Sequence, residues 1–385
     1  MRIRRRVLAL WIVSLATSLA FAQSSAVPTK APDSSLPVEI VVPVAPIAVR
    51  GAGASHLFYE LHLTNFRATP LEMTNLEVHA GDNDGRLLEG YSGQEISDRL
   101  VPPGAPRDLP DKRVLGAGLR AIVMLHLRFE GTRPVPSRIW HRVTFADSSV
   151  DTRPMIVAAQ RPLVIDPPLR GGDWLAANGP SNDSVHRRTL LLINGEPHIA
   201  QRFAIDWIKL GPGGRPAHDD RSRNENWNGY GEDVLAVADG TVIATKDGIP
   251  DNVPLTEKRA VPITLDTLGG NLVILDIGNG RYATYAHLIP QSLRFSVGAK
   301  VRRGQVLGRL GNSGNSDAPH LHFHITDGAS AFASEGVPYV FETMQFRGNV
   351  ASLEKLIGDE PWIPRSGTVV RRNEIPLDAA VVRFP

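Results

Sequence analysis

Three histidines alternate along one short segment, and their spacing is typical of metal ligands. His320, His322 and His324 are separated by single apolar residues and follow a loop rich in glycine, asparagine and serine at 311–316. Alternate side chains of a β-strand share a face, so the sequence predicts three imidazoles on one side of a strand and apolar residues on the other. Neutral imidazoles grouped in this way are good zinc ligands. Three solvated strand histidines are the alternative interpretation.

An aspartate within an apolar segment is the candidate carboxylate ligand. The chain has no cysteine, so a metal would have to be bound by histidine, aspartate or glutamate. Asp206 lies in a predicted strand at 199–207, where Phe203, Ile205 and Trp207 alternate towards the core. An acidic side chain at such a place needs a partner. A salt bridge with Arg202 is the alternative to a metal.

A catalytic zinc usually takes three protein ligands, so a further histidine is needed beside Asp206 and His322. His198 is near in sequence, but eight extended residues span about 26 Å. If residues 194–197 form the turn of a hairpin, residue 185 or a neighbour lies opposite Asp206. Opposite residues have Cβ atoms about 5 Å apart. We therefore expect His186 as the ligand, with His198 as the alternative if the chain bends at 201–202.

Two other histidines lie outside this set. His287 ends a predicted strand at 281–287, where alternation places it on the face of Ala283 and Tyr285 and at the edge of a site. His218 lies in a polar loop, and we interpret it as solvated. The five histidines before residue 150 are interpreted as ordinary strand residues.

The elements that must position these residues are strands, and the expected fold class is all-β. Residues 37–165 show short alternating strands broken by glycine and proline, which favours an N-terminal antiparallel β-sandwich of unknown role. A junction at 166–180 leads to a second β-rich domain, 166–348. Polar insertions at 211–232 and 247–262 should be surface loops. Residues 349–385 are expected to be a C-terminal tail.

The N-terminus has the layout of a secretory signal peptide. Four arginines within residues 2–6 precede a 16-residue apolar run, 7–22, which ends in Ala-Phe-Ala. The run is shorter than the ~20 residues that span a bilayer. Residues 23–36 are interpreted as a linker. Without those four arginines the 42 basic residues fall to 38 against 40 acidic ones, a net charge of −2. We expect an exported protein, periplasmic or secreted to the cell envelope, with no stable membrane span after cleavage.

The second domain resembles a known family, the lysostaphin-type zinc endopeptidases, also called LytM-domain or glycyl-glycine endopeptidases. The most specific match is the stretch Gly-Asn-Ser-Gly-Asn-Ser-x-Ala-Pro-His-x-His-Phe, which begins at Gly311. The resemblance covers about residues 186–327. Its other segments are 236–242, 269–274, 285–288, 297–301 and 304–308.

The resemblance implies a LytM-type antiparallel β-sheet metallopeptidase domain with one catalytic Zn2+ held by a histidine, an aspartate and the second histidine of His-x-His. Asp206 and His322 match the last two ligands, and His287 and His320 match the family's two non-ligand catalytic histidines. The usual first ligand stands four residues before the aspartate, where this chain has Arg202. His186 or His198 would replace it.

Two further departures affect the expected site. His324 stands where the family often has Glu or Gln, so it could tune the site or add a contact. An insertion at 207–233 separates the metal aspartate from the following strand and could reshape the groove.

The expected function is a zinc metalloendopeptidase that hydrolyses peptide bonds of peptidoglycan. His320 or His287 would take a proton, and the other would stabilise the oxyanion. Arg202 at the usual ligand position favours an alternative, an inactive regulator that activates other wall hydrolases. A wall-binding module is the third reading. An envelope protein could bind the N-terminal domain, whereas the near-neutral charge does not favour nucleic acid.

Overall fold

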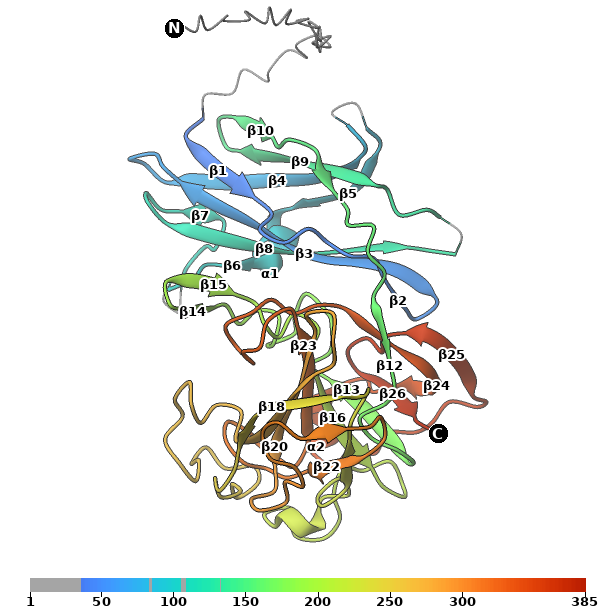
Figure 1. The fold of residues 1–385 in the computed structure, drawn as a ribbon. Coiled ribbons are helices and arrows are strands. Elements are labelled where there is room, and N and C mark those ends of the chain that lie inside the picture. The colour runs from blue at the N-terminus through green and yellow to red at the C-terminus, as the bar shows by residue number, and fades with distance from the viewer. Residues whose placement is uncertain (1–35, 83–84, 105–108, 132) are drawn as a thin grey trace, which may run out of the picture. The chain divides into compact units, whose positions relative to one another are not determined.

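The computed structural model describes residues 36–82, 85–104, 109–131 and 133–385. The expected signal peptide and all but the last residue of the expected linker lie outside these residues. Residues Leu36–Pro385 form one compact unit. Nearly all of its regular structure is antiparallel β-sheet, so the predicted all-β fold class is confirmed (Figure 1). Among the described residues, no helix has the length and hydropathy needed to cross a membrane.

The N-terminal part contains two antiparallel sheets. One consists of β1 (Val38–Val41), β2 (Val49–Gly51), β3 (Ala54–Asn65), β6 (Leu100–Val101) and β8 (Arg120–Phe129). The other consists of β4 (Leu71–Ala80), β5 (Leu87–Ser92), β7 (Val114–Leu115), β9 (Arg138–Phe145), β10 (Ser149–Asp151) and β11 (Met155–Ile156). The helix α1 (Gly93–Arg99) begins after Ser92, whose backbone N–H donates to the Glu95 carboxylate (3.3 Å).

The alternation predicted for strand β3 is present, but both of its faces are buried. Leu57, Tyr59 and Leu61 belong to a hydrophobic cluster that both N-terminal sheets share. Phe58, on the opposite face, belongs to the core of the C-terminal part and lies edge-on to Phe203, with ring centroids 6.0 Å apart. Strand β3 therefore joins the two parts of the compact unit, which the sequence pattern alone does not indicate.

A large sheet forms the C-terminal part. Its strand order is β12-β24-β26-β13-β16-β23-β20-β19-β18-β21, and β25 pairs with β24. The bounds are β12 (Leu163–Ile165), β13 (Asp173–Ala177), β16 (Ile205–Leu210), β18 (Gly240–Lys246), β19 (Asn271–Asp276), β20 (Tyr282–Leu288), β21 (Lys300–Val301), β23 (Leu321–Thr326), β24 (Tyr339–Asn349), β25 (Val369–Glu374) and β26 (Ala380–Arg383). Within this sheet, as far as the structure describes it, β12 and β24 pair in parallel and the other neighbours pair antiparallel.

Shorter elements complete the fold. Two strand pairs stand apart, β14 (Leu191–Ile193) with β15 (Glu196–His198), and β17 (Asp233–Leu235) with β22 (Val306–Arg309). A 3-10 turn occupies Asn224–Asn226, and the helix α2 occupies Leu353–Ile357. The segment expected as a tail thus contains α2, β25 and β26, and both strands pair with β24.

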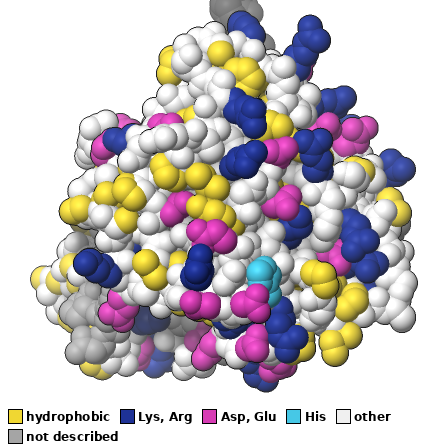
Figure 2. Space-filling model, turned by 90° about the horizontal axis from the view of Figure 1, so that it is seen from below, with side chains coloured by type: hydrophobic (Ala, Val, Ile, Leu, Met, Phe, Trp, Pro, Cys, Tyr) yellow, Lys and Arg dark blue, Asp and Glu magenta, His cyan; other side chains and the backbone are white. Residues whose placement is uncertain are grey.

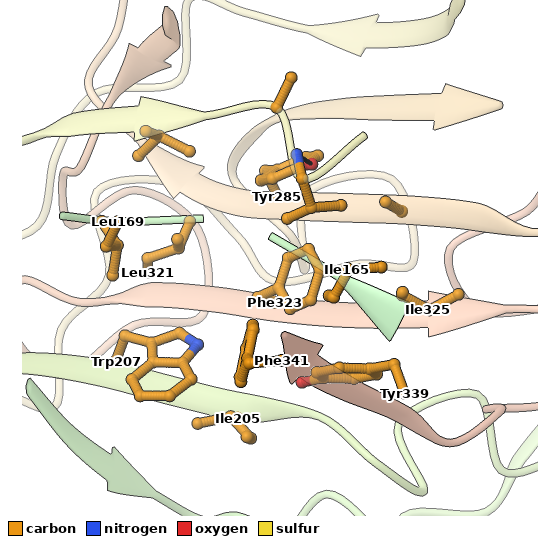
Figure 3. Packing of buried hydrophobic residues seen from close by; sticks show 14 of the residues in the cluster. Ile165, Leu169, Ile205, Trp207, Tyr285, Leu321, Phe323, Ile325, Tyr339 and Phe341 are labelled. Atoms are coloured by element: carbon orange, nitrogen blue, oxygen red, sulfur yellow. Dashed lines mark hydrogen bonds between the residues drawn. The ribbon is translucent and has the colours of Figure 1, made fainter. Parts of the chain in front are cut away.

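Aromatic side chains fill the core beneath the central strands. Trp207 of β16 and Phe341 of β24 are fully buried, with ring centroids 5.8 Å apart. Phe323 of β23 packs beside Tyr285 and Tyr339 (Figure 3). Trp207 is adjacent to Asp206 on β16, and Phe323 is adjacent to His322 on β23. Because neighbouring side chains of a strand point to opposite faces, the burial of these two aromatic residues turns Asp206 and His322 to the other face of the sheet.

We predict that Phe341→Ala lowers the free energy of unfolding by about 3–5 kcal/mol, because it leaves a cavity among Trp207, Tyr339 and Phe384. Urea unfolding followed by tryptophan fluorescence measures the change. The control is Val370→Ala on the neighbouring strand β25, where the side chain is exposed and the change should stay within about 0.5 kcal/mol. Equal stability of the two variants would contradict this packing.

Candidate metal centre

Strands β16 and β23 bring the carboxylate and one histidine together. They pair antiparallel at the centre of the large sheet, and Asp206 lies directly opposite His322. The Asp206 Oδ1 atom is 2.9 Å from the His322 Nδ1 atom. Both side chains are buried. The short strand predicted for the alternating histidines is present as β23: His322 and His324 alternate with core residues as expected, and His320 immediately precedes the strand.

His186 reaches the same carboxylate from a turn. Its Nε2 atom is 3.2 Å from Asp206 Oδ2, and its Nδ1 atom is 3.1 Å from the Asn178 carbonyl oxygen. Asn178 follows β13, whose last residue, Ala177, pairs with Asp206. The Asn178 side chain donates to Asp206 Oδ2 (2.8 Å), and its φ of 53° turns its carbonyl towards His186 and Ser184.

The hydrogen bonds of the two histidines assign their protons. A carbonyl oxygen only accepts, so His186 Nδ1 must donate to Asn178, which leaves His186 Nε2 unprotonated in the neutral ring. His324 Nε2 likewise donates to the Ala331 carbonyl (3.0 Å), so His324 Nδ1 accepts from His322 Nε2 (2.9 Å). His322 Nδ1 then carries a lone pair, directed at Asp206.

In their neutral forms, His186 and His322 therefore direct two imidazole lone pairs at the Asp206 carboxylate, and a proton or a metal ion has to lie between them. Burial lowers the pKa of His322 to about 3 and that of His324 to about 4, which keeps both rings neutral. One ligand atom from each of His186, Asp206 and His322 lies within 4.8 Å of the others. Atoms bound to a tetrahedral ion at about 2 Å are roughly 3.3 Å apart. The donor set fits a zinc ion.

His320 lies on the other side of the carboxylate. Its Nδ1 atom donates to the Ala318 carbonyl (2.8 Å), and its Nε2 atom is 3.3 Å from Asp206 Oδ1. Burial acts to lower the pKa of His320, but the Asp206 charge and the hydrogen bonds to Asp206 and Ala318 together raise it above the ordinary value. Burial likewise acts to raise the pKa of Asp206, and His186 and His320 instead hold it well below its usual range. His320 is thus a hydrogen-bond donor.

His287 presents a free acceptor. Its Nδ1 atom donates to the Ser313 carbonyl (2.7 Å), which leaves Nε2 unprotonated, and burial holds the pKa of His287 well below the ordinary value. Its ring centroid lies 4.8 Å from that of His320 and 5.8 Å from that of His322. The arrangement places a proton acceptor and a proton donor beside one prospective metal site.

The face predicted for His287 by alternation is wrong. Ala283 and Tyr285 belong to the core, whereas His287 lines the cleft together with Thr284 and Ala286. His287 has a φ of 63°, and the pairing of β19 with β20 shifts register at this point. A left-handed residue at a bulge changes the face to which the side chain points. The two-residue alternation used in the sequence analysis cannot predict such a change.

The hairpin that led to His186 is only partly correct. Strands β14 and β15 do meet at Asn194 and Gly195, but they pair Leu191 with His198, and residues 199–204 turn away. The predicted strand at 199–207 is therefore wrong before Ile205, where β16 begins. The structure brings His186 to Asp206 along a different path, through the turn after β13.

The remaining candidates lie away from the cluster. His198 Nδ1 is 3.6 Å from Glu335 Oε1, and His218 pairs with Asp219 at the surface. Arg202 donates to Glu60 and Glu335 instead of forming the alternative ion pair with Asp206. Asn178, which binds both Asp206 and His186, was missed; its Asn-Gly dipeptide is a turn signal that could have suggested a left-handed residue there.

The site opens into a cleft of about 800 Å³. Asp206 lines it with the five histidines His186, His287, His320, His322 and His324. The second insertion contributes Leu255, Thr256, Glu257 and Arg259. The first insertion contacts the cleft indirectly, because Arg221 donates to the carbonyl of Ile357 in α2, and Ile357 lines the cleft.

Comparisons with known proteins place a family domain in the same region. Residues 227–333 match the sequence model of Peptidase family M23, so the resemblance drawn from the motifs is confirmed there. His287, His320 and His322 lie inside the match, and His186 and Asp206 lie before it. A 96-residue segment is 35% identical to Endolysin 2638A of Staphylococcus phage 2638A, over 24% of this chain and 16% of the endolysin, so the match spans less than a fifth of that relative.

Solved structures show weaker similarities. The catalytic domain of the antimicrobial peptidase lysostaphin from Staphylococcus simulans is 24% identical, with a TM-score of 0.19, over 31% of this chain and 82% of that one. A putative peptidase M23 from Pseudomonas aeruginosa is 16% identical, with a TM-score of 0.26, over 66% of this chain and 84% of that one.

His324→Phe tests the orientation of His322. The variant removes the acceptor for His322 Nε2–H, and loss of such a partner typically weakens metal binding by about 10–100-fold. We predict a loss of zinc affinity in that range, measured by competition with a chromogenic chelator. His324→Gln retains an acceptor and should bind more tightly than His324→Phe. His198→Phe, away from the cluster, should match the parent, and equal affinity of His324→Phe and the parent would contradict the assignment.

Proposed function

Because residues 227–333 form a domain of peptidase family M23, we propose that this chain is a zinc metalloendopeptidase that hydrolyses peptide bonds of bacterial peptidoglycan. The observation that carries the proposal is the convergence of His186 Nε2, His322 Nδ1 and the Asp206 carboxylate. Two further histidines, one an acceptor and one a donor, lie beside this cluster in an open cleft.

The three convergent side chains would hold the ion. Asn178 orients two of them, since its side-chain amide donates to Asp206 and its carbonyl accepts from His186. His324 orients the third by accepting from His322 Nε2. Bound zinc would polarise the scissile carbonyl and lower the pKa of an attacking water.

The non-ligand histidines divide the proton chemistry. His287 Nε2 is unprotonated because Nδ1 donates to Ser313, so His287 is the general base that accepts the proton of the water. His320 Nε2 carries a proton because Asp206 raises the pKa of His320, which favours the doubly protonated ring. It donates a hydrogen bond to the substrate oxygen that gains charge.

The cleft suits an extended peptide. Its wall combines apolar Leu255 and Phe332 with charged Glu257 and Asp317, so it can contact both the apolar and the polar groups of a peptide. On the face shown in Figure 2, acidic and basic side chains are intermixed, without the single-sign surface typical of nucleic-acid binding. The arginines and apolar run of residues 2–22 support export to the envelope, where the wall is accessible.

The inactive-regulator reading loses its main support. It rested on Arg202 at the usual position of the first ligand, but His186 lies where that ligand is needed. A regulator would still be recognised if the protein bound zinc without lysing sacculi.

The test measures zinc and lysis together in the purified mature chain. We predict one zinc per chain and release of new amino groups from sacculi. His322→Ala and Asp206→Asn should each lose zinc and reduce the rate at least about 100-fold, since each removes a ligand. A chelator should abolish lysis and added zinc should restore it. The control His198→Ala should retain both properties.

Two results would contradict the proposal. A mature chain without zinc excludes the metallopeptidase, and so does lysis that survives His322→Ala. Zinc binding without lysis would indicate the regulator.

A further inference from the structure

The loop that carries His186 is held by the N-terminal sheet. The next residue, Arg187, is fully buried. Its Nε atom donates to Glu60 Oε1 (2.8 Å), and its Nη2 atom donates to the carbonyls of Tyr59 (2.5 Å) and Leu125 (2.8 Å). Glu60 and Tyr59 belong to β3 and Leu125 to β8. These three hydrogen bonds would have to break for Arg187 to leave.

The same carboxylate holds a second arginine. Arg202 Nε donates to Glu60 Oε2 (2.8 Å), its Nη2 atom donates to Glu335 Oε2 (2.7 Å), and its Nη1 atom donates to the Gly336 carbonyl (3.1 Å). Each oxygen of Glu60 thus accepts from a different guanidinium group. Arg202 is thereby directed away from Asp206, four residues further along the chain.

The charges of this network balance. Two guanidinium groups, Arg187 and Arg202, face two carboxylates, Glu60 and Glu335. Glu60 is 3% exposed and the arginines 0% and 5%. Removing one member of a buried pair leaves an uncompensated charge, which is strongly destabilising locally. The segment between β13 and β14 therefore depends on Glu60 for its position.

The segment around His186 contacts different parts of the protein on its two sides. His186 faces Asp206 of the large sheet and Asn178 in the turn after β13, whereas Arg187 faces β3 and β8. Arg188 extends the second set, because its Nη2 atom donates to the carbonyl of Asp98 in α1. Successive residues thus join the candidate metal centre to the N-terminal sheets.

We propose that Glu60 is a positioning residue of the metal centre: through Arg187 it holds His186 at Asp206, so the N-terminal sheet completes the zinc site. The inference rests on the proposed zinc function. It assigns the N-terminal region a part in building the site, in addition to any contact with wall or partner.

The experiment is a double-mutant cycle on zinc affinity in the full mature chain, measured by chelator competition. Glu60→Gln keeps the size of the side chain and one acceptor but removes the charge. We expect it to weaken zinc binding by about 10–100-fold, the range for outer partners of metal ligands. His186→Ala should weaken binding at least as much. The double variant should bind like His186→Ala, because both changes act through one ligand.

A matched control separates this effect from general destabilisation. Asp151→Asn removes a carboxylate that pairs with Arg142 in the same N-terminal part, and it should leave zinc affinity unchanged. If Glu60→Gln does not fold, Arg187→Lys replaces it in the cycle, since lysine keeps the charge but cannot reproduce the forked donors.

The outcomes are distinguishable. Unchanged zinc affinity in a folded Glu60→Gln protein overturns the inference. Additive losses in the double variant overturn it as well, because Glu60 would then act independently of His186. A parent chain that binds no zinc contradicts the proposed function itself.

Discussion

A buried carboxylate with three imidazole nitrogens turned towards it is the constraint on which the rest of the structure depends. Asp206 is held at the centre of the large sheet because Ile205 and Trp207 on either side of it are buried in the core. Desolvation of such a charge is unfavourable unless cations or hydrogen-bond donors surround it. Asn178 and His320 supply donors, and the lone pairs of His186 and His322 leave a place that only a proton or a metal ion can fill. The fold thus presents a cation site in which the protein's own hydrogen bonds have already oriented the ligands.

Much of this arrangement could be predicted from local patterns. Alternation placed His322 and His324 opposite the core, and the apolar neighbours of Asp206 marked it as an unusual carboxylate. Both inferences need only the period of a strand. The route to His186 could not be obtained in this way: the hairpin exists, yet its pairing ends at Leu191 and His198, and the chain then turns. The structure does place His186 beside Asp206, but the turn after β13 brings it there and not the hairpin.

The parts that sequence patterns missed are those set by single backbone angles or by contacts between distant segments. His287 and Asn178 both have positive φ, at 63° and 53°, and each changes where a functional group points. Neither residue type requires this conformation, so only the surrounding bulge or turn selects it. The link between Glu60 and Arg187 joins residues 127 positions apart. No local period carries that information. The sequence does show two arginines near a predicted metal site without an adjacent acidic residue, so their charge has to be balanced by another part of the chain.

That charge balance also connects the chain's two departures from the family pattern. Arg202 stands where the first ligand of the family is usually found, and His186, the ligand proposed in its place, belongs to the segment that contains Arg187. Glu60 binds both arginines, so the two changes are parts of one arrangement. A histidine placed at position 202 in an otherwise unchanged chain would leave one oxygen of the buried Glu60, and the partly buried Glu335, without the cation that now pairs with them. It would also compete with His186, which Arg187 still holds at Asp206. Returning to the usual spacing therefore requires coordinated changes in the N-terminal sheet, which makes that sheet a structural component of the site.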